Sequence, residues 1–197
     1  MLEKEIFLKI RNFALENSEK NDIHGFSHVE RVYNTAIKIG HILNANMKVV
    51  KIAALLHDIG RIEEKESLSK QNHAEISALK AKQFLLTNNF NLSEKEIKNI
   101  IHSIKAHSFS NKISPYTLEA KILSDADKLD AIGAIGVFRT IGFTLQKNGG
   151  IDQVIEHLEN KILQLKEQIF LEYSRTIAEE RHNIVLDFYD NLKKEIS

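Results

Sequence analysis

The chain has 197 residues, one proline, eight glycines and no cysteine, a length that suits one domain with a core of its own. Lysine plus arginine equals aspartate plus glutamate at 27 each, so no global field favours binding to nucleic acid or to an anionic membrane. The absence of cysteine excludes disulfides, thiolate metal sites and a cysteine nucleophile, and it fits a cytoplasmic location.

The N-terminal part of the sequence predicts two helices. The first five residues are too charged for a signal peptide, and no apolar run in the chain reaches the roughly 18 residues of a membrane span. Apolar residues at helical spacing predict a helix over residues 2–16. Ser27 and Glu30 form a Ser-x-x-Glu pattern that predicts a second helix start, with His28 in its first turn.

The central element is predicted at residues 48–58, where five apolar residues precede His57 and Asp58. Two ionisable groups at the end of a buried segment are costly unless something pairs them. A divalent metal is a suitable partner, because it accepts both neutral imidazole and carboxylate as ligands. Gly60 is expected to end this helix in the left-handed conformation, and the polar stretch 63–71 is expected to be a loop.

Two further helices are predicted from their capping residues. A helix is expected from Asn72 to about residue 87, with His73 in its first turn. Ser93 opens another helix, and its pattern of apolar residues places His107 near the edge of the buried stripe. His102 points almost the opposite way, so His107 is expected to be the inward histidine of the two.

A nearly buried helix is predicted from residue 117 to about 143, because the sequence there is apolar with little interruption. It carries three aspartates, at positions 125, 127 and 130. Helical periodicity places Asp125 nearer the lysines of the polar side. It therefore favours Asp127 or Asp130 as the inward carboxylate.

The C-terminal part predicts a helical hairpin. Residues 148–150, Asn-Gly-Gly, form the clearest turn in the chain. A helix with coiled-coil spacing follows at 151–170. A last helix at about 174–195 carries Arg181 in the middle of an inward-facing apolar stripe that includes Ile177, Ile184 and Val185. Because its charge cannot be removed by deprotonation, Arg181 needs a partner, which we expect to be either a core carboxylate or the phosphate tail of a substrate.

These elements predict an all-α fold, since no segment reads convincingly as a strand. We expect a single domain over residues 1–197, with a core at about 20–145 and the hairpin at about 151–195 packed on it.

Three groups stand out along the chain: His28, the pair His57 and Asp58, and an aspartate within 125–130. Their separations are too long for a local loop site, so the ligands must meet through folding. This arrangement resembles the HD-domain superfamily of metal-dependent phosphohydrolases, which are helical bundles with the pattern His, His-Asp, Asp. The resemblance is carried by the motifs at 22–32, 55–61 and 125–134.

Carried over residue by residue, the resemblance implies four metal ligands: His28, His57, Asp58 and Asp127. Asp127 is chosen because the last aspartate of the family precedes a basic residue and a leucine, as it does here. His73 and His107 match positions where two-metal relatives have further ligands, although we expect one ion. The ligand set favours Mn²⁺ or Mg²⁺, with Fe²⁺, Ni²⁺ or Zn²⁺ as alternatives.

The resemblance also suggests residues for chemistry and for substrate. The catalytic candidates are Asp58, His24 and Glu63. The general base is left open, because Glu63 and Glu64 both lie close to the His-Asp pair. The candidates for substrate binding are Arg31, Arg61, Lys128 and Arg181.

The branch that the sequence resembles implies a nucleotide substrate, with a nucleoside triphosphate split into monophosphate and pyrophosphate. Dephosphorylation of a nucleoside monophosphate is the second choice. The rival from another class is a non-catalytic, metal-containing module that senses a nucleotide, and an oxygenase is a third possibility. We expect no nucleic-acid or membrane partner, and a monomer or a homodimer.

Overall fold

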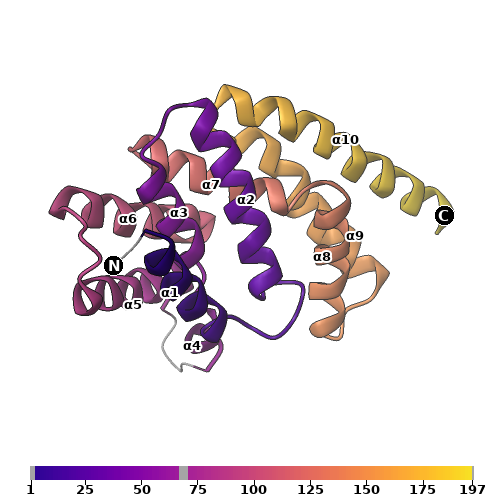
Figure 1. Ribbon diagram of the computed structural model, residues 1–197. Helices are drawn as coiled ribbons and strands as arrows, with labels where there is room; N and C mark the ends of the chain where they lie inside the picture. The colour runs from indigo at the N-terminus through magenta and orange to yellow at the C-terminus, as the bar shows by residue number, and fades with distance from the viewer. Residues whose placement is uncertain (1–2, 67–70, 197) are drawn as a thin grey trace. The chain divides into compact units, whose positions relative to one another are not determined.

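The computed structural model describes residues 3–66 and 71–196, and these residues form helices with no β-strand among them (Figure 1). The predicted all-α fold is confirmed. In chain order the elements are α1 (Glu3–Glu16), α2 (Phe26–Ile42), α3 (Met47–Leu56), α4 (Arg61–Glu66), α5 (His73–Asn88), α6 (Glu94–His107), the 3₁₀ helix η1 (Phe109–Asn111), α7 (Leu118–Asp130), α8 (Gly133–Gln146), α9 (Ile151–Asn160), the 3₁₀ helix η2 (Ile162–Gln168) and α10 (Glu172–Glu195). Within the described ranges, no helix is both long and apolar enough to span a membrane.

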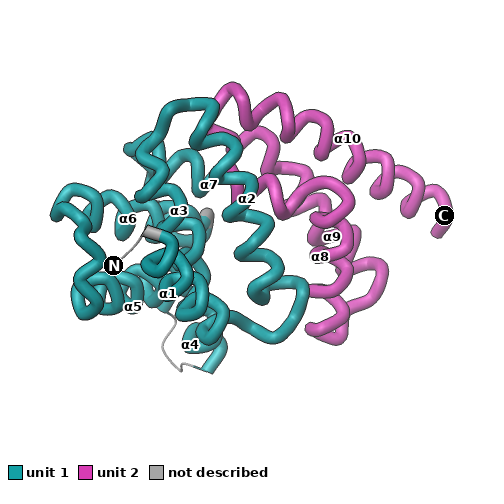
Figure 2. The backbone as a smooth tube through the Cα atoms, in the orientation of Figure 1, with its two compact units in different colours: residues 1–124 teal, residues 125–197 magenta. Residues whose placement is uncertain are grey.

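The chain divides into two compact units, residues 1–124 and residues 125–197, with the division falling inside α7 (Figure 2). The first unit holds helices α1 to α6 and the start of α7. The second holds the end of α7 and helices α8 to α10. Each unit is described by itself below.

The first unit is built around α3. Every residue of this helix from Val49 to Leu56 except Lys51 is buried, and the helix packs against α1, α2, α5 and α6. Asn46 caps its N-terminus by accepting from the backbone N–H groups of Lys48 and Val49. The predicted central helix is therefore confirmed, and it ends directly before His57.

Gly60 ends this segment for a different reason from the one predicted. It does not adopt a left-handed conformation, which among the described glycines is found at Gly133. Instead, a Cβ atom at position 60 would lie 2.6 Å from the backbone N of Ser77 and 2.8 Å from the carbonyl O of His73. The lack of a side chain lets the turn after α3 touch the backbone of α5.

Of the three helix starts predicted from capping residues, those of α5 and α6 are correct and that of α2 is not. Ser93 and Glu96 form the predicted capping box at α6, and Asn72 caps α5. The predicted box at Ser27 is wrong, because the N-cap of α2 is Gly25, two residues earlier, and the Ser27 hydroxyl donates instead to the Asp22 carboxylate. Glu30, its expected partner, pairs with Arg11.

The stretch expected to be a loop is partly helical. Residues 61–66 form α4, which contacts α5. The part of the expected loop at 67–70 lies outside the described residues, as does residue 2 of the first predicted helix. Periodicity did not reveal α4 because five of its six residues are charged and Ile62 alone forms no apolar stripe. Its charged side chains instead pair with neighbouring elements, as Glu63 does with Lys80.

Two breaks in the second unit were also missed. The predicted helix 117–143 is interrupted between α7 and α8, where Gly133 has a φ of +79°. The predicted helix 151–170 is α9 followed by η2, with the α-helix ending at Asn160. In both places apolar residues continue through the break, so hydrophobic periodicity alone did not detect it. The final helix α10 agrees with its prediction.

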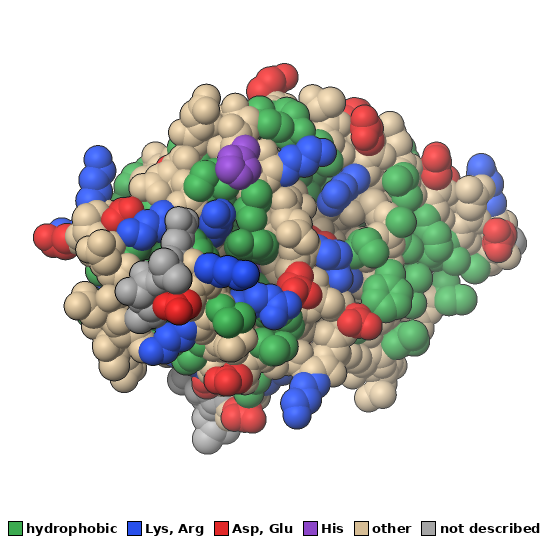
Figure 3. Space-filling model, viewed as in Figure 1, with side chains coloured by type: hydrophobic (Ala, Val, Ile, Leu, Met, Phe, Trp, Pro, Cys, Tyr) green, Lys and Arg blue, Asp and Glu red, His purple; other side chains and the backbone are tan. Residues whose placement is uncertain are grey.

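The second unit has large apolar side chains on its surface. Figure 3 shows hydrophobic side chains gathered over its part of the molecule. Six exposed large apolar residues lie on α8, α9 and α10: Ile135, Phe138, Leu145, Ile151, Ile184 and Leu186. Ile184 was expected to face inward on α10, so the buried side of that helix differs from the predicted stripe.

Candidate metal centre

Five ionisable side chains meet inside the first unit, each at the end of a helix. His28 lies in the first turn of α2, His57 and Asp58 follow α3 directly, His73 opens α5 and His107 closes α6. All five are buried, with exposed fractions between 0% and 7%. Folding therefore brings these candidate ligands together from separate helices, and their role as ligands stays a prediction.

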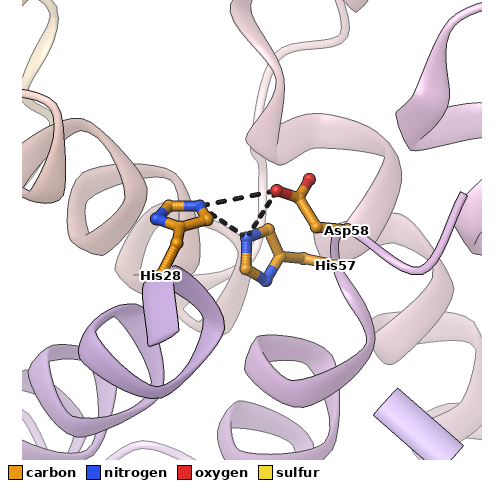
Figure 4. A group of neighbouring side chains, drawn as sticks. All are labelled: His28, His57 and Asp58. Carbon is orange, nitrogen blue, oxygen red and sulfur yellow. Dashed lines mark hydrogen bonds and ion pairs between the residues drawn. The ribbon is translucent and has the colours of Figure 1, made fainter. Parts of the chain in front are cut away.

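Asp58 belongs to two groups of possible ligands, and Figure 4 shows the one that it forms with His28 and His57. Its Oδ2 atom is 3.4 Å from Nε2 of His28 and 3.5 Å from Nε2 of His57. Its Oδ1 atom is 3.6 Å from Nε2 of His73 and 3.4 Å from Nε2 of His107. The two groups, His28–His57–Asp58 and Asp58–His73–His107, each bring three possible ligand atoms within 4.8 Å of one another.

The histidine tautomers are set by the atoms behind the rings. Nδ1 of His57 is 2.7 Å from the carbonyl O of Ala54, and Nδ1 of His107 is 2.5 Å from that of Ile104. A carbonyl oxygen only accepts, so in both rings Nδ1 carries the hydrogen and donates it. The lone pair is then on Nε2, the nitrogen that faces Asp58, which is the arrangement needed for metal ligation.

The charge states also suit a cation. Burial opposes ionisation of Asp58, but the Arg61 guanidinium and the facing imidazoles hold the pKa of this carboxyl well below its usual range. Arg61 Nε donates to Oδ2 at 2.5 Å. Burial lowers the pKa of His73, so its imidazole is neutral near pH 7. An ionised carboxylate together with imidazole nitrogens is a ligand set for a divalent ion.

The fit to a metal rests on atoms that are otherwise unsatisfied. Within the described part of the chain, Oδ1 of Asp58, Nε2 of His73 and Nε2 of His107 are buried and have no hydrogen-bond partner. Buried polar atoms are rarely left this way. Their separations exceed the usual hydrogen-bond range, whereas ligand atoms about 2.0–2.2 Å from a shared ion lie roughly 3.0–3.6 Å apart. The residues present therefore fit a divalent metal.

The burial of the three aspartates of α7 differs from the order that helical periodicity predicted. The most buried is Asp125, which was assigned to the polar side; it accepts from the backbone N–H groups of Phe170 and Leu171, each at 2.9 Å. Asp130 is buried and accepts from Arg139 at 2.9 Å. Asp127 is half-buried and belongs to the second unit, and its role as a ligand stays a prediction.

The acidic residues of α4 are placed differently from each other. Glu63, the catalytic candidate, forms an ion pair with Lys80 of α5. Its neighbour Glu64 contacts His73 of the cluster. From sequence, Glu64 was only an alternative to Glu63 as the general base. Predicting a helix at residues 61–66 would have distinguished the two, because in a helix Glu64 lies on the same face as Arg61 and Glu63 does not.

The remaining candidates lie on both units. In the first unit, His24 is half-buried with its ring edge-on to His28, the centroids 6.5 Å apart, and Arg31 is half-buried on α2. In the second unit, Lys128 is buried with its ammonium 5.1 Å from the ring centroid of Phe170. Arg181 donates from Nη1 to the carbonyl O of Leu129, and its role in binding the phosphate of a substrate stays a prediction.

Comparison with known proteins places this chain in a family. A family model described as the HD domain matches residues 25–132, more than half of the chain. The chain belongs to the HD-domain family.

Individual relatives agree with that assignment. The chain is 30% identical to the Bacillus subtilis protein YpgQ over 187 residues, which cover 91% of this chain and 87% of YpgQ. The crystal structure of YpgQ in complex with ADP matches with a TM-score of 0.79 over 99% of this chain and 97% of that one, at 30% identity. An HD-superfamily hydrolase from Bacillus thuringiensis matches with a TM-score of 0.74 at 27% identity, over 98% and 97% of the two chains.

Family membership and these neighbours identify the protein as a metal-dependent phosphohydrolase of the HD superfamily. The resemblance seen in the sequence motifs is thereby confirmed. The buried cluster around Asp58 is the part of the first unit that fits the metal of such an enzyme.

Proposed function

We propose that the protein hydrolyses nucleoside triphosphates to a nucleoside monophosphate and pyrophosphate. The observation that carries the proposal is the cluster of four imidazoles around the two oxygens of Asp58. Support for a nucleotide comes from YpgQ, which was crystallised with ADP. ADP contains the α–β phosphoanhydride bond that this reaction would cleave.

The ligand set would hold one or two divalent ions. His28, His57 and Asp58 Oδ2 form one half-site, to which the family resemblance adds Asp127. His73, His107 and Asp58 Oδ1 form the other. The sequence favoured a single ion; the three unsatisfied atoms of the second half-site support a second one. Nitrogen and oxygen ligands without sulfur favour Mn²⁺ or Mg²⁺, with Fe²⁺, Ni²⁺ or Zn²⁺ as alternatives.

In this mechanism the protein supplies position and charge. A bound divalent ion supplies charge neutralisation at the phosphoryl group and lowers the pKa of a bound water. Asp58 is ionised and buried, so it can orient that water without a competing bulk solvent. Arg61, half-buried beside Asp58, offers a guanidinium suited to a phosphate oxygen. Water oxygen bonds to the α-phosphorus, the bond to the β-phosphate breaks, and pyrophosphate and a proton are released.

A metal-by-substrate assay tests the proposal. Metal-free protein is loaded with Mn²⁺ or Mg²⁺ and given nucleoside tri-, di- and monophosphates, and pyrophosphate and orthophosphate are measured separately. We expect equal amounts of monophosphate and pyrophosphate from a triphosphate, and no turnover after chelation. Orthophosphate as the only phosphorus product would reject this function in favour of a phosphatase.

A further inference from the structure

The short helix α4 connects the two halves of the metal centre through two side chains. Arg61 and Glu64 are three residues apart, so they lie on the same face of the helix. Arg61 donates to Oδ2 of Asp58, and Glu64 contacts His73. The two half-sites therefore have neighbours of opposite charge.

Glu64 holds His73 at two points. Its Oε1 atom accepts from the backbone N–H of His73 at 2.8 Å and lies 3.2 Å from Nδ1 of the imidazole. An ionised carboxylate only accepts hydrogen bonds, so Nδ1 carries the hydrogen. The lone pair is left on Nε2, which is buried, unsatisfied and 3.6 Å from Oδ1 of Asp58.

His73 differs in this respect from two other histidines of the cluster. His57 and His107 have their tautomers fixed by backbone carbonyls one helical turn earlier, and no side-chain substitution can remove those acceptors. The tautomer of His73 depends on the side chain of Glu64. A carboxylate behind a ligating imidazole also raises the basicity of the ligand nitrogen, which strengthens its bond to a metal.

We propose that Glu64 is a positioning residue that fixes the Nδ1–H tautomer of His73 and sets the affinity of the ion held by His73 and His107. The inference rests on the metal-binding part of the proposed function and is independent of which phosphate bond is cleaved. Loss of such a partner costs about 10–100-fold in metal affinity. Glu64→Ala should therefore weaken the ion at this half-site by that factor and leave the other ion unchanged.

Three variants test this assignment. Glu64→Ala removes the acceptor, whereas Glu64→Gln keeps an acceptor oxygen and removes only the charge. Glu66→Ala is the matched control, because Glu66 is an exposed acid on the same helix. Its substitution changes the charge and the helix propensity of α4 by the same amount as Glu64→Ala does. Mn²⁺ stoichiometry and affinities are measured by calorimetry and electron paramagnetic resonance. Nitrogen-15 spectra of the metal-free protein report which nitrogen of His73 carries the proton.

The proposal expects a wild-type His73 with its proton on Nδ1. It expects a mixed or reversed tautomer with weakened Mn²⁺ binding in Glu64→Ala, a smaller loss in Glu64→Gln, and wild-type values in Glu66→Ala. If Glu64→Ala lowers the melting temperature but binds Mn²⁺ like wild type, Glu64 is merely structural and the proposal fails. It fails equally if Glu66→Ala gives the same loss, or if the wild-type tautomer is Nε2–H. None of these measurements requires hydrolysis. A failure of the Glu64 proposal can therefore be told apart from a failure of the proposed reaction.

Discussion

Asp58 is the one residue that both halves of the metal centre share. Its Oδ2 atom faces His28 and His57, and its Oδ1 atom faces His73 and His107. A carboxylate that is nearly inaccessible to solvent can stay ionised only where opposite charge compensates for lost hydration. In the first unit that compensation comes from Arg61, and a bound cation would add to it.

The residue-scale prediction is that Asp58→Ala abolishes metal-dependent hydrolysis and lowers metal affinity by more than about 100-fold, beyond the loss expected for a residue outside the coordination sphere. Helical content should be nearly unchanged, because α3 still buries its apolar side chains. Metal content, turnover and circular dichroism check these outcomes. A variant that keeps wild-type metal content would show that the cluster is not the metal site.

At the scale of elements, the position of α5 depends on the absence of a side chain at Gly60. Three atoms of α5, in residues His73, Ile76 and Ser77, lie within 2.8 Å of where a Cβ at this position would be. Two of them are backbone atoms, which cannot move without shifting the helix. Since His73 opens α5, the packing at Gly60 also fixes the location of one candidate ligand.

Gly60→Ala should therefore destabilise the protein by about 1–3 kcal/mol, the usual cost of overpacking, and should weaken metal binding as α5 moves. Gly150→Ala is the control: Gly150 is exposed, and a Cβ there meets a single atom at 3.7 Å. We expect the control to stay within about 0.5 kcal/mol of wild type. Chemical denaturation and Mn²⁺ titration measure both effects, and equal stability of the two variants would contradict the steric explanation.

The sequence predicted elements well where a local signal marked their ends. The capping residues Asn72 and Ser93 gave the starts of α5 and α6 correctly, because a cap is satisfied within one turn of the chain. The break at Gly133 was missed because apolar residues continue on both sides of it. Helix α4 was missed because the pairs that hold it, such as Glu63 with Lys80, are tertiary contacts.

The candidate site could also be predicted only where a local sequence motif marks its residues. The order His28, His57, Asp58 is a strong motif, and His73 and His107 followed from the family pattern. Glu64 has no motif of its own, and its contact with His73 exists only once α4 forms. The burial of Asp125 could not be read from periodicity, because its partners are backbone N–H groups 45 and 46 residues further along the chain.

At the scale of the whole molecule, the candidate metal centre contains buried polar atoms that a bound ion would satisfy. Three buried polar atoms of the described chain lack partners there, and unsatisfied buried groups cost free energy. An ion that binds the folded cluster but not the unfolded chain stabilises the protein in proportion to the logarithm of its concentration. Stability should therefore depend on metal more strongly than on any single surface interaction.

Mn²⁺ at about 100 times its dissociation constant should contribute about 2.7 kcal/mol, and so raise the melting temperature by roughly 5–10 °C for a chain of this length. Chelation should reverse the shift. Calorimetry with and without metal measures it, and Asp58→Ala should show no shift. If Mn²⁺ does not change the melting temperature of the wild-type protein, the cluster has no appreciable affinity for this ion.

The hydrogen bonds between Asp125 and the residues just before α10 have a consequence for synthesis of the chain. The fully buried carboxylate of Asp125 is satisfied by the backbone of Phe170 and Leu171. At about 5–20 residues per second, the ribosome needs roughly 2–9 s to add the 45 residues between them. During that interval the carboxylate stays hydrated, and the segment around it cannot bury it. We therefore expect the second unit to complete the burial of Asp125 only after Phe170 and Leu171 have been synthesised.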